Sequence, residues 1–182
     1  MASVVVIYHS GYGHTAKQAE AVAAGAKADL ITIDANGDIT EADWTKLDAA
    51  KAIIFGSPTY MGSVSWQFKK FADASSKRWF TQEWKNKIFA GFTNSASLNG
   101  DKGSTISYLM TLAMQHSGVW VGTGLMPASM KASTRQDVNS LGGYSGALMA
   151  TPADASTDEV NKGDLETARL LGVRVAEFAA KA

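Results

Sequence analysis

Five short apolar runs, spread along most of the sequence, constrain the fold more than any other feature. They are rich in β-branched residues and occupy residues 4–8, 30–33, 52–55, 88–92 and 119–121. A strand that faces water on one side alternates apolar and polar residues, whereas these runs are almost continuously apolar. The pattern therefore predicts parallel strands whose two faces are both covered by helices.

Segments with a helical period lie between and after these runs. Apolar residues recur at three- and four-residue spacing in residues 16–26, 66–74, 106–114 and 165–179, which is typical of amphipathic helices. Ser65 is a predicted N-cap, residues 40–43 resemble a capping box, and residues 156–159 form a stronger one ahead of the last helix. A strand–helix unit repeated five times predicts an α/β protein with three layers.

Residues 123–155 interrupt this regular alternation. They are rich in Gly, Ser, Thr and Ala and have no convincing period. A structureless stretch of that length is too long for an ordinary connector. We interpret it as a functional loop or a lid.

Length and charge exclude several classes of protein. The chain has 182 residues, which predicts one domain over residues 1–182. Lys plus Arg and Asp plus Glu both total 17, so no general field attracts nucleic acid or an anionic membrane. The absence of cysteine suits a reduced compartment. The first residues lack a basic region, and their apolar run is far shorter than the ~20 residues of a membrane span. We therefore expect a cytoplasmic protein that is neither exported nor inserted.

Three of the predicted strands are followed by small, polar, turn-prone loops. In an open parallel sheet, ligands bind beyond the carboxyl ends of the strands, where the strand order reverses. Glycines allow a ligand to approach the backbone, hydroxyls supply donors, and the first loop leads into a helix whose free N–H groups suit a phosphate. The candidate cofactor-binding residues are Ser10, Gly11, Tyr12, Gly13, His14 and Thr15 in the first loop, Pro58, Thr59, Tyr60, Met61 and Gly62 in the second, and Thr93, Asn94, Ser95, Ala96, Ser97 and Gly100 in the third.

The first loop is compatible with two kinds of nucleotide site. Residues 10–16 contain no Lys or Arg, so we expect backbone and hydroxyl groups to hold a phosphate there. Gly11, Gly13 and Ala16 also satisfy the loose G-x-G-x-x-G/A pattern of a dinucleotide site, with Asp34 as its ribose-binding acid. That alternative leaves the second and third loops without a role. A plain strand-to-helix turn would explain the first loop alone.

Several motifs occur in a fixed order along the chain. They are the first loop, residues 55–59 with Gly62 and Gln67, the loop at Asn94, His116-Ser117-Gly118, residues 142–147 and residues 165–169. Together they resemble the flavodoxin-like NAD(P)H:quinone oxidoreductases of the WrbA type, over nearly the whole chain. The resemblance implies a flavodoxin-like fold, with a doubly wound five-stranded parallel sheet of order 2-1-3-4-5 in a three-layer α/β/α arrangement. It also implies bound FMN and two-electron reduction of quinones by NADH or NADPH.

The resemblance assigns roles to two further residues. A histidine at the position of His116 approaches the flavin across a subunit contact in that family, and Trp79 matches an aromatic wall for a planar substrate. His116 and Trp79 are therefore the candidate catalytic residues. A histidine satisfied at a helix end and ordinary packing of Trp79 are the alternatives. The three histidines have no metal-ligand spacing, so we expect no metal.

Two functions remain in competition. We expect an FMN-dependent oxidoreductase that transfers two electrons from NADH or NADPH to quinones, with the flavin supplying the chemistry. Its expected partners are small quinone and nicotinamide molecules and further copies of the chain, as a dimer or tetramer, without nucleic acid. The alternative is a flavodoxin-type carrier of single electrons. Such carriers are usually strongly acidic, whereas this chain is neutral.

Overall fold

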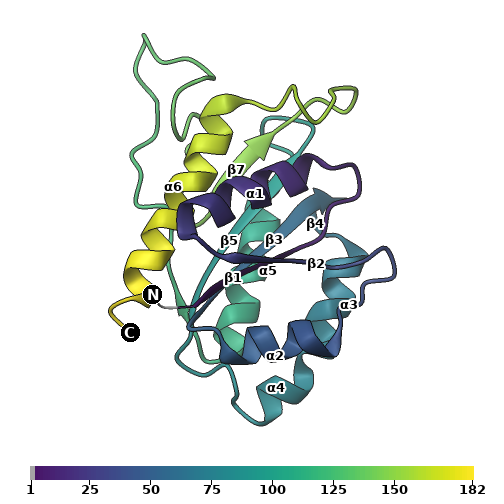
Figure 1. Cartoon of the computed structure of the whole chain (residues 1–182). Helices are drawn as coiled ribbons and strands as arrows, with labels where there is room; N and C mark the ends of the chain where they lie inside the picture. Colours follow the sequence, from purple (N-terminus) through teal and green to yellow (C-terminus); the bar gives the residue numbers. More distant parts are fainter. Residues whose placement is uncertain (1–2) are drawn as a thin grey trace.

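A parallel sheet lies between two layers of helices in the computed structural model, which describes residues 3–182 (Figure 1). The sheet order is β2-β1-β3-β5-β6, and the order reverses between β1 and β3. The two-residue strand β4 pairs antiparallel with the end of β3. This arrangement confirms the predicted fold class and strand order, with β5 and β6 as the fourth and fifth strands. The strands are β1 (Val4–Tyr8), β2 (Asp29–Thr32), β3 (Ala52–Tyr60), β4 (Ser63–Val64), β5 (Ile88–Ser95), β6 (Val119–Trp120) and β7 (Ala147–Ala150).

The outer strand position beside β5 is shared by two short strands. β6 pairs with the start of β5, where Ile88 lies opposite Val119, and β7 pairs with its end, where Ser95 lies opposite Ala150. Residues 121–146, here called the intervening segment, leave the sheet between them and extend past the amino end of α6 (Figure 1). The interpretation of residues 123–155 as one loop is thus wrong at β7, whose position is fixed by pairing with β5.

Each face of the sheet is buried by its own set of helices. Val4 and Val6 of β1 face one apolar cluster with α1 and α6, while Val5 and Ile7 face a second cluster with α2, α3 and α5. Successive side chains on a strand point to opposite faces, so a continuously apolar strand fills both clusters. The helices are α1 (His14–Ala26), α2 (Glu41–Ala49), α3 (Trp66–Ala74), α4 (Ser76–Phe80), α5 (Lys102–Gln115) and α6 (Lys162–Ala179).

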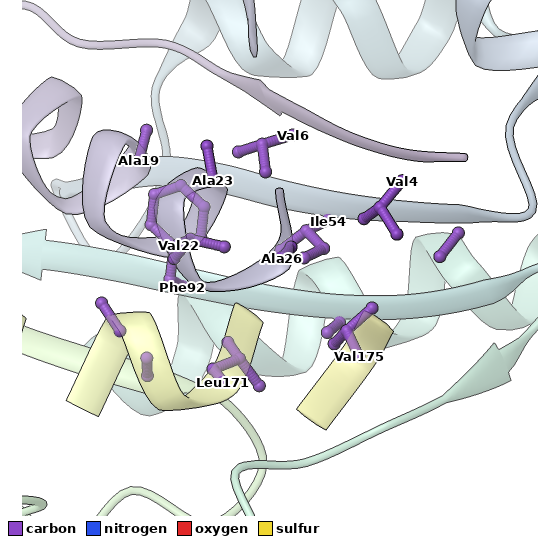
Figure 2. Close-up of a cluster of buried hydrophobic side chains, with 14 of the residues drawn as sticks. Val4, Val6, Ala19, Val22, Ala23, Ala26, Ile54, Phe92, Leu171 and Val175 are labelled. Atoms are coloured by element: carbon purple, nitrogen blue, oxygen red, sulfur yellow. The ribbon is translucent and has the colours of Figure 1, made fainter. Parts of the chain in front are cut away.

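Two glycines allow α1 and α6 to pack backbone against backbone. A Cβ atom on Gly25 would lie 1.9 Å from the carbonyl oxygen of Arg169, and one on Gly172 would lie 2.1 Å from that of Val22. Neither distance is sterically possible, so both positions require glycine. Figure 2 shows the result, with the small side chains of α1 and Leu171 and Val175 of α6 gathered over the sheet. This close packing fixes the amino end of α1 at the sheet edge where the first loop lies.

Local capping explains where several helices begin. Thr40 and Asp43 form the predicted capping box of α2, and the Ser65 hydroxyl accepts from the Phe68 amide at the start of α3. The prediction for α6 is wrong, because residues 156–159 close a separate turn in which the Glu159 carboxylate accepts from the Ser156 amide. α6 instead begins after Asn161, which caps it.

Across residues 3–182, none of the helices combines the length and the apolar character that crossing a bilayer requires.

Candidate functional site

A cavity of about 400 Å³ opens at the carboxyl edge of the sheet, where the strand order reverses between β1 and β3. Its volume lies within the ~300–1,000 Å³ typical of small-molecule sites. The structure brings all three predicted loops together around it. The lining residues are Tyr12, His14, Thr15, Pro58, Thr59, Tyr60, Asn94, Ser95, Ala96, Thr151 and Ala153.

The first loop presents a helix terminus without any positive side chain. Gly13 precedes α1 with a φ of 90°, a left-handed conformation that favours glycine. The Ser10 hydroxyl accepts from the amides of Gly13 and Ala16, both at 3.1 Å. The amides of His14 and Thr15 do not bond to this hydroxyl, and at the start of a helix they have no intrahelical acceptor. The buried Thr15 lines the cavity, and its hydroxyl makes no hydrogen bond to any residue in the range 3–182.

His14 connects the first loop to the segment that follows β7. Its Nε2 atom lies 2.8 Å from the carbonyl oxygen of Ala155. Thr157 also packs here, since a Cβ on Gly13 would lie 2.7 Å from its methyl group. Residues 151–157 therefore cover one side of the first loop. They also contribute two residues of the cavity lining that the sequence did not predict, Thr151 and Ala153.

Two tyrosines form an aromatic side of the cavity. The rings of Tyr12 and Tyr60 meet edge to face, with centroids 6.3 Å apart. Gly11 permits this contact, because a Cβ there would lie 2.6 Å from the Tyr60 hydroxyl oxygen. Burial, followed by the proximity of Tyr12, raises the pKa of Tyr60 above its usual value of 10, so the phenol is neutral at physiological pH. Met61 and Gly62 form the left-handed turn after Tyr60 and lie outside the cavity lining.

Hydroxyl groups from neighbouring strands support the cavity floor. Thr59 bonds to Thr93 of β5 and to Thr105 of α5, both at 2.8 Å. The Thr151 hydroxyl donates to the Asn94 side-chain oxygen at 3.1 Å. The Asn94 side-chain amide group donates to no other group in residues 3–182 and is available to a ligand. Thr93, another predicted cofactor-binding residue, is not among the lining residues and lies behind Thr59, to which it is hydrogen-bonded.

The third loop separates the cavity from a larger groove. Ala96 lines both, while Ser97 and Leu98 line only the groove, which has a volume of about 970 Å³. Gly100 closes the loop with a φ of 52°, and a Cβ there would lie 2.1 Å from the Ser95 hydroxyl oxygen. The far wall of the groove carries charged side chains: Arg135, Glu159 and Lys162.

The two predicted catalytic residues lie together, in a different place. His116 and Trp79 line a hollow between α3, α4 and α5, and His116 follows the last residue of α5, whose first residue adjoins the third loop. His116 is 2% exposed, and its Nε2 lies 2.9 Å from the Ser75 hydroxyl. Its ring packs against Trp84, and burial lowers its pKa to about 4. Within one copy of the chain, neither residue lines the cavity.

The donor set of the cavity fits FMN. The helix terminus and the Thr15 hydroxyl suit a phosphate monoester, and the tyrosine pair and Pro58 provide a flat apolar side for a planar ring. The third loop brings Asn94, Ser95 and Ala96 to the cavity, where polar groups suit the polar edge of such a ring. In residues 3–182, no group of three His, Asp or Glu side chains is arranged to hold a metal ion.

Comparisons with known proteins agree with this site. A family model described as NADPH-dependent FMN reductase matches residues 10–132, which include all the predicted site residues. The chain belongs to this family. Membership of this FMN-binding, flavodoxin-like family confirms the predicted cofactor class, FMN with a reduced nicotinamide nucleotide.

Two relatives and a solved structure match nearly the whole chain. Flavodoxin FldP of Pseudomonas aeruginosa (strain UCBPP-PA14) is 56% identical over 178 residues, covering 98% of this chain and 97% of that protein. An NAD(P)H dehydrogenase (quinone) of Sinorhizobium fredii (strain NBRC 101917 / NGR234) is 31% identical over 200 residues, covering 100% and 98%. The crystal structure of a flavodoxin, WrbA-like protein from Agrobacterium tumefaciens superposes with a TM-score of 0.84 at 52% identity, covering 100% and 99%.

Proposed function

We propose that this protein is an FMN-dependent oxidoreductase that passes two electrons from NADH or NADPH to a quinone. The observation that carries the proposal is the groove of about 970 Å³ that continues from the cavity past Ala96. A carrier of single electrons needs only an accessible edge of its flavin. An enzyme that binds a nicotinamide dinucleotide must also accommodate the part of that molecule that does not reach the flavin.

The residues of the chain hold and enclose the cofactor. The amides at the start of α1 and the Thr15 hydroxyl hold the FMN phosphate, Tyr12 and Tyr60 flank its ring, and the third loop borders the ring's polar edge. Bound FMN supplies hydride acceptance and two-electron transfer. No acid–base residue is needed beside it, and the Nε2 of His14, which lines the cavity, is already within hydrogen-bond distance of the Ala155 carbonyl oxygen.

The groove supplies the cations that the cavity lacks. Among the described residues, neither Lys nor Arg lines the cavity, while Arg135 and Lys162 line the groove. Arg135 is already paired with Asp164 at 2.6 Å, whereas Lys162 has no ion-pair partner in the part of the chain that the structure describes. On this proposal the nicotinamide enters the cavity, and the phosphates of the dinucleotide extend along the groove toward Lys162.

A catalytic role for His116 and Trp79 stays a prediction and requires a second copy of the chain. Their hollow must lie over the cavity of a partner for either residue to meet a substrate. Trp79 is half-exposed and can make such a contact directly, whereas the buried imidazole of His116 contacts Ser75 and Trp84. Trp79 is therefore the residue that we propose to meet the substrate first.

A flavodoxin-type carrier is the second candidate. One observation favours it, the name of the relative that is 56% identical, Flavodoxin FldP. The equal numbers of acidic and basic residues disfavour it, because carriers dock on basic reductases through acidic surfaces. The relatives named NAD(P)H dehydrogenase (quinone) support the enzyme.

Anaerobic reduction distinguishes the two candidates. The FMN-loaded protein is mixed with NADH or with NADPH, and its yellow absorbance is followed. The enzyme is expected to bleach directly and to recover its colour when a benzoquinone is added. A protein that bleaches only with a separate reductase, and takes up one electron at a time in a reductive titration, would be a carrier.

A further inference from the structure

A lysine is buried behind the third loop. Lys102, the first residue of α5, is 1% exposed. Its ammonium donates to three successive carbonyl oxygens of that loop, those of Ser97 at 2.5 Å, Leu98 at 3.1 Å and Asn99 at 3.4 Å. An ammonium has three donors, so all of them are used on this one loop.

This arrangement determines where the loop amides point. All peptide bonds in residues 3–182 are trans, and in a trans peptide the C=O and the following N–H point in opposite directions. The amides of Leu98, Asn99 and Gly100 therefore point away from the buried ammonium, on the outer side of a loop whose Ala96 lines the cavity and whose Leu98 lines the groove. None of the three donates to another group in the described part of the chain.

We infer that Lys102 is a positioning residue that holds the third loop with these three amides presented to the polar edge of bound FMN. This inference rests on FMN binding in the cavity and is independent of the electron donor and acceptor. The left-handed residues Gly100 and Asp101 complete the turn from the loop into α5. Without the ammonium, the Leu98 carbonyl oxygen has no donor in the described residues, and those of Ser97 and Asn99 keep only the Ser95 hydroxyl and the Lys102 backbone amide, so the loop is held less firmly.

The charged groups around Lys102 connect it to the other segments of the site. Asp164 of α6 and Arg135 of the intervening segment face the ammonium. Asp164 is buried, pairs with Arg135 and accepts from the Ala150 amide at the end of β7. Burial is the main cause that lowers the pKa of Lys102 to about 8, with Arg135 adding to the effect and Asp164 opposing it. The Lys102 amine is thus mostly protonated at neutral pH and loses its proton as the pH rises through about 8.

The pH dependence of FMN affinity follows from this geometry. Binding FMN favours the ordered loop, and burial in the ordered loop makes Lys102 lose its proton more readily than an exposed lysine does, so binding is coupled to release of that proton. Affinity is therefore expected to be level below about pH 8 and to rise as the pH increases above that value, toward the ~10.4 of an exposed lysine. The FMN phosphate stays dianionic throughout this range, since its second pKa is ~6.

The test measures the dissociation constants of FMN and riboflavin by flavin fluorescence from about pH 7 to about pH 9.5. Lys102→Met is expected to weaken both ligands roughly ten- to a hundredfold at pH 7 and to remove the pH dependence. Lys102→Arg, which stays charged, is expected to keep most of the affinity over the whole range. Riboflavin is included because the loop is proposed to contact the ring rather than the phosphate.

Lys87 provides a matched control. It is also partly buried, donates to two carbonyl oxygens, those of Asp48 and Ala50, and has a pKa lowered chiefly by burial. It precedes β5, at the edge of the sheet opposite the cavity. Lys87→Met is expected to leave the flavin dissociation constants and their pH dependence unchanged.

Two results would overturn the inference. The first is a Lys102→Met protein that binds both flavins as tightly as the unmodified chain does. The second is a Lys102→Met protein that binds them more weakly but with the same pH profile. If that variant does not fold, the comparison between the unmodified chain and Lys102→Arg decides. An affinity that rises above about pH 8 in the former and stays level in the latter supports the inference, whereas two identical profiles contradict it.

Discussion

At the scale of single residues, Thr15 is the hydroxyl best placed for a phosphate. It lies on the first turn of α1, lines the cavity and has no hydrogen-bond partner in residues 3–182. We predict that Thr15→Ala weakens FMN by ~1.5–3 kcal/mol, roughly ten- to a hundredfold, and leaves riboflavin binding nearly unchanged. Fluorescence titration with both flavins measures this, with Thr45→Ala on the surface of α2 as the control. Equal losses for both flavins would mean that Thr15 serves only the fold.

His116 makes the stability of the protein depend on pH. Its folded pKa of about 4 lies below the ~6.5 of an exposed histidine, so only the unfolded chain binds this proton between those values. Stability is therefore complete above about pH 6.5 and is lost as the pH falls toward 4. We measure the free energy of unfolding of the flavin-free chain in urea at about pH 7 and at about pH 4.5. The loss of free energy between these two pH values should be about 2–3 kcal/mol smaller in His116→Gln than in the unmodified chain. The same difference in both proteins would contradict this. His9, whose pKa burial also lowers, adds to the slope in both.

At the scale of secondary-structure elements, the sequence predicts what local patterns determine. The apolar runs and caps locate most strands and helices, and the three polar loops locate the cavity, because parallel strands end at one edge of the sheet. It does not predict that β7 returns to the sheet beside β5. Ala147–Ala150 is only four residues long and has no flanking period, so tertiary pairing alone defines it. Thr151 and Ala153 were missed for the same reason.

The groove between the third loop and α6 makes a prediction about the dinucleotide. If its phosphates lie near Lys162, Lys162→Gln should raise the Michaelis constant for NADH and NADPH by roughly three- to tenfold, as expected for an exposed charge contact. Reduced nicotinamide mononucleotide keeps one of the two phosphates but lacks the adenylate half of the molecule, so its Michaelis constant should change less. Lys85→Gln, an exposed lysine near the opposite edge of the sheet, is the control. An equal effect on the mononucleotide would exclude this placement, whereas no reaction with any nicotinamide would instead exclude the enzyme itself.

At the scale of the whole molecule, the two halves of the predicted active site lie at different places on one copy. The cofactor cavity lies at the carboxyl edge of the sheet, while Trp79 and His116 share the hollow between α3, α4 and α5. The sequence identifies both groups of residues but not the distance between them, because that distance depends on helix packing. An assembly that places the hollow of one copy over the cavity of another would unite them.

Exposed aromatic residues beside that hollow predict self-association. Trp79 and Phe80 of α4 are 46% and 81% exposed, and apolar groups of this size at the surface mark contact sites. We predict at least a dimer in light scattering at micromolar concentration. Phe80→Ser should weaken the assembly, whereas Phe178→Ser, which removes an exposed aromatic from α6 on the other face, should not.

Trp79→Ala should raise the Michaelis constant for the quinone while FMN stays bound, because Trp79 would contact the substrate in the neighbouring copy. A monomer that still reduces quinones at full rate would exclude a catalytic role for both Trp79 and His116, since neither reaches the cavity of its own chain.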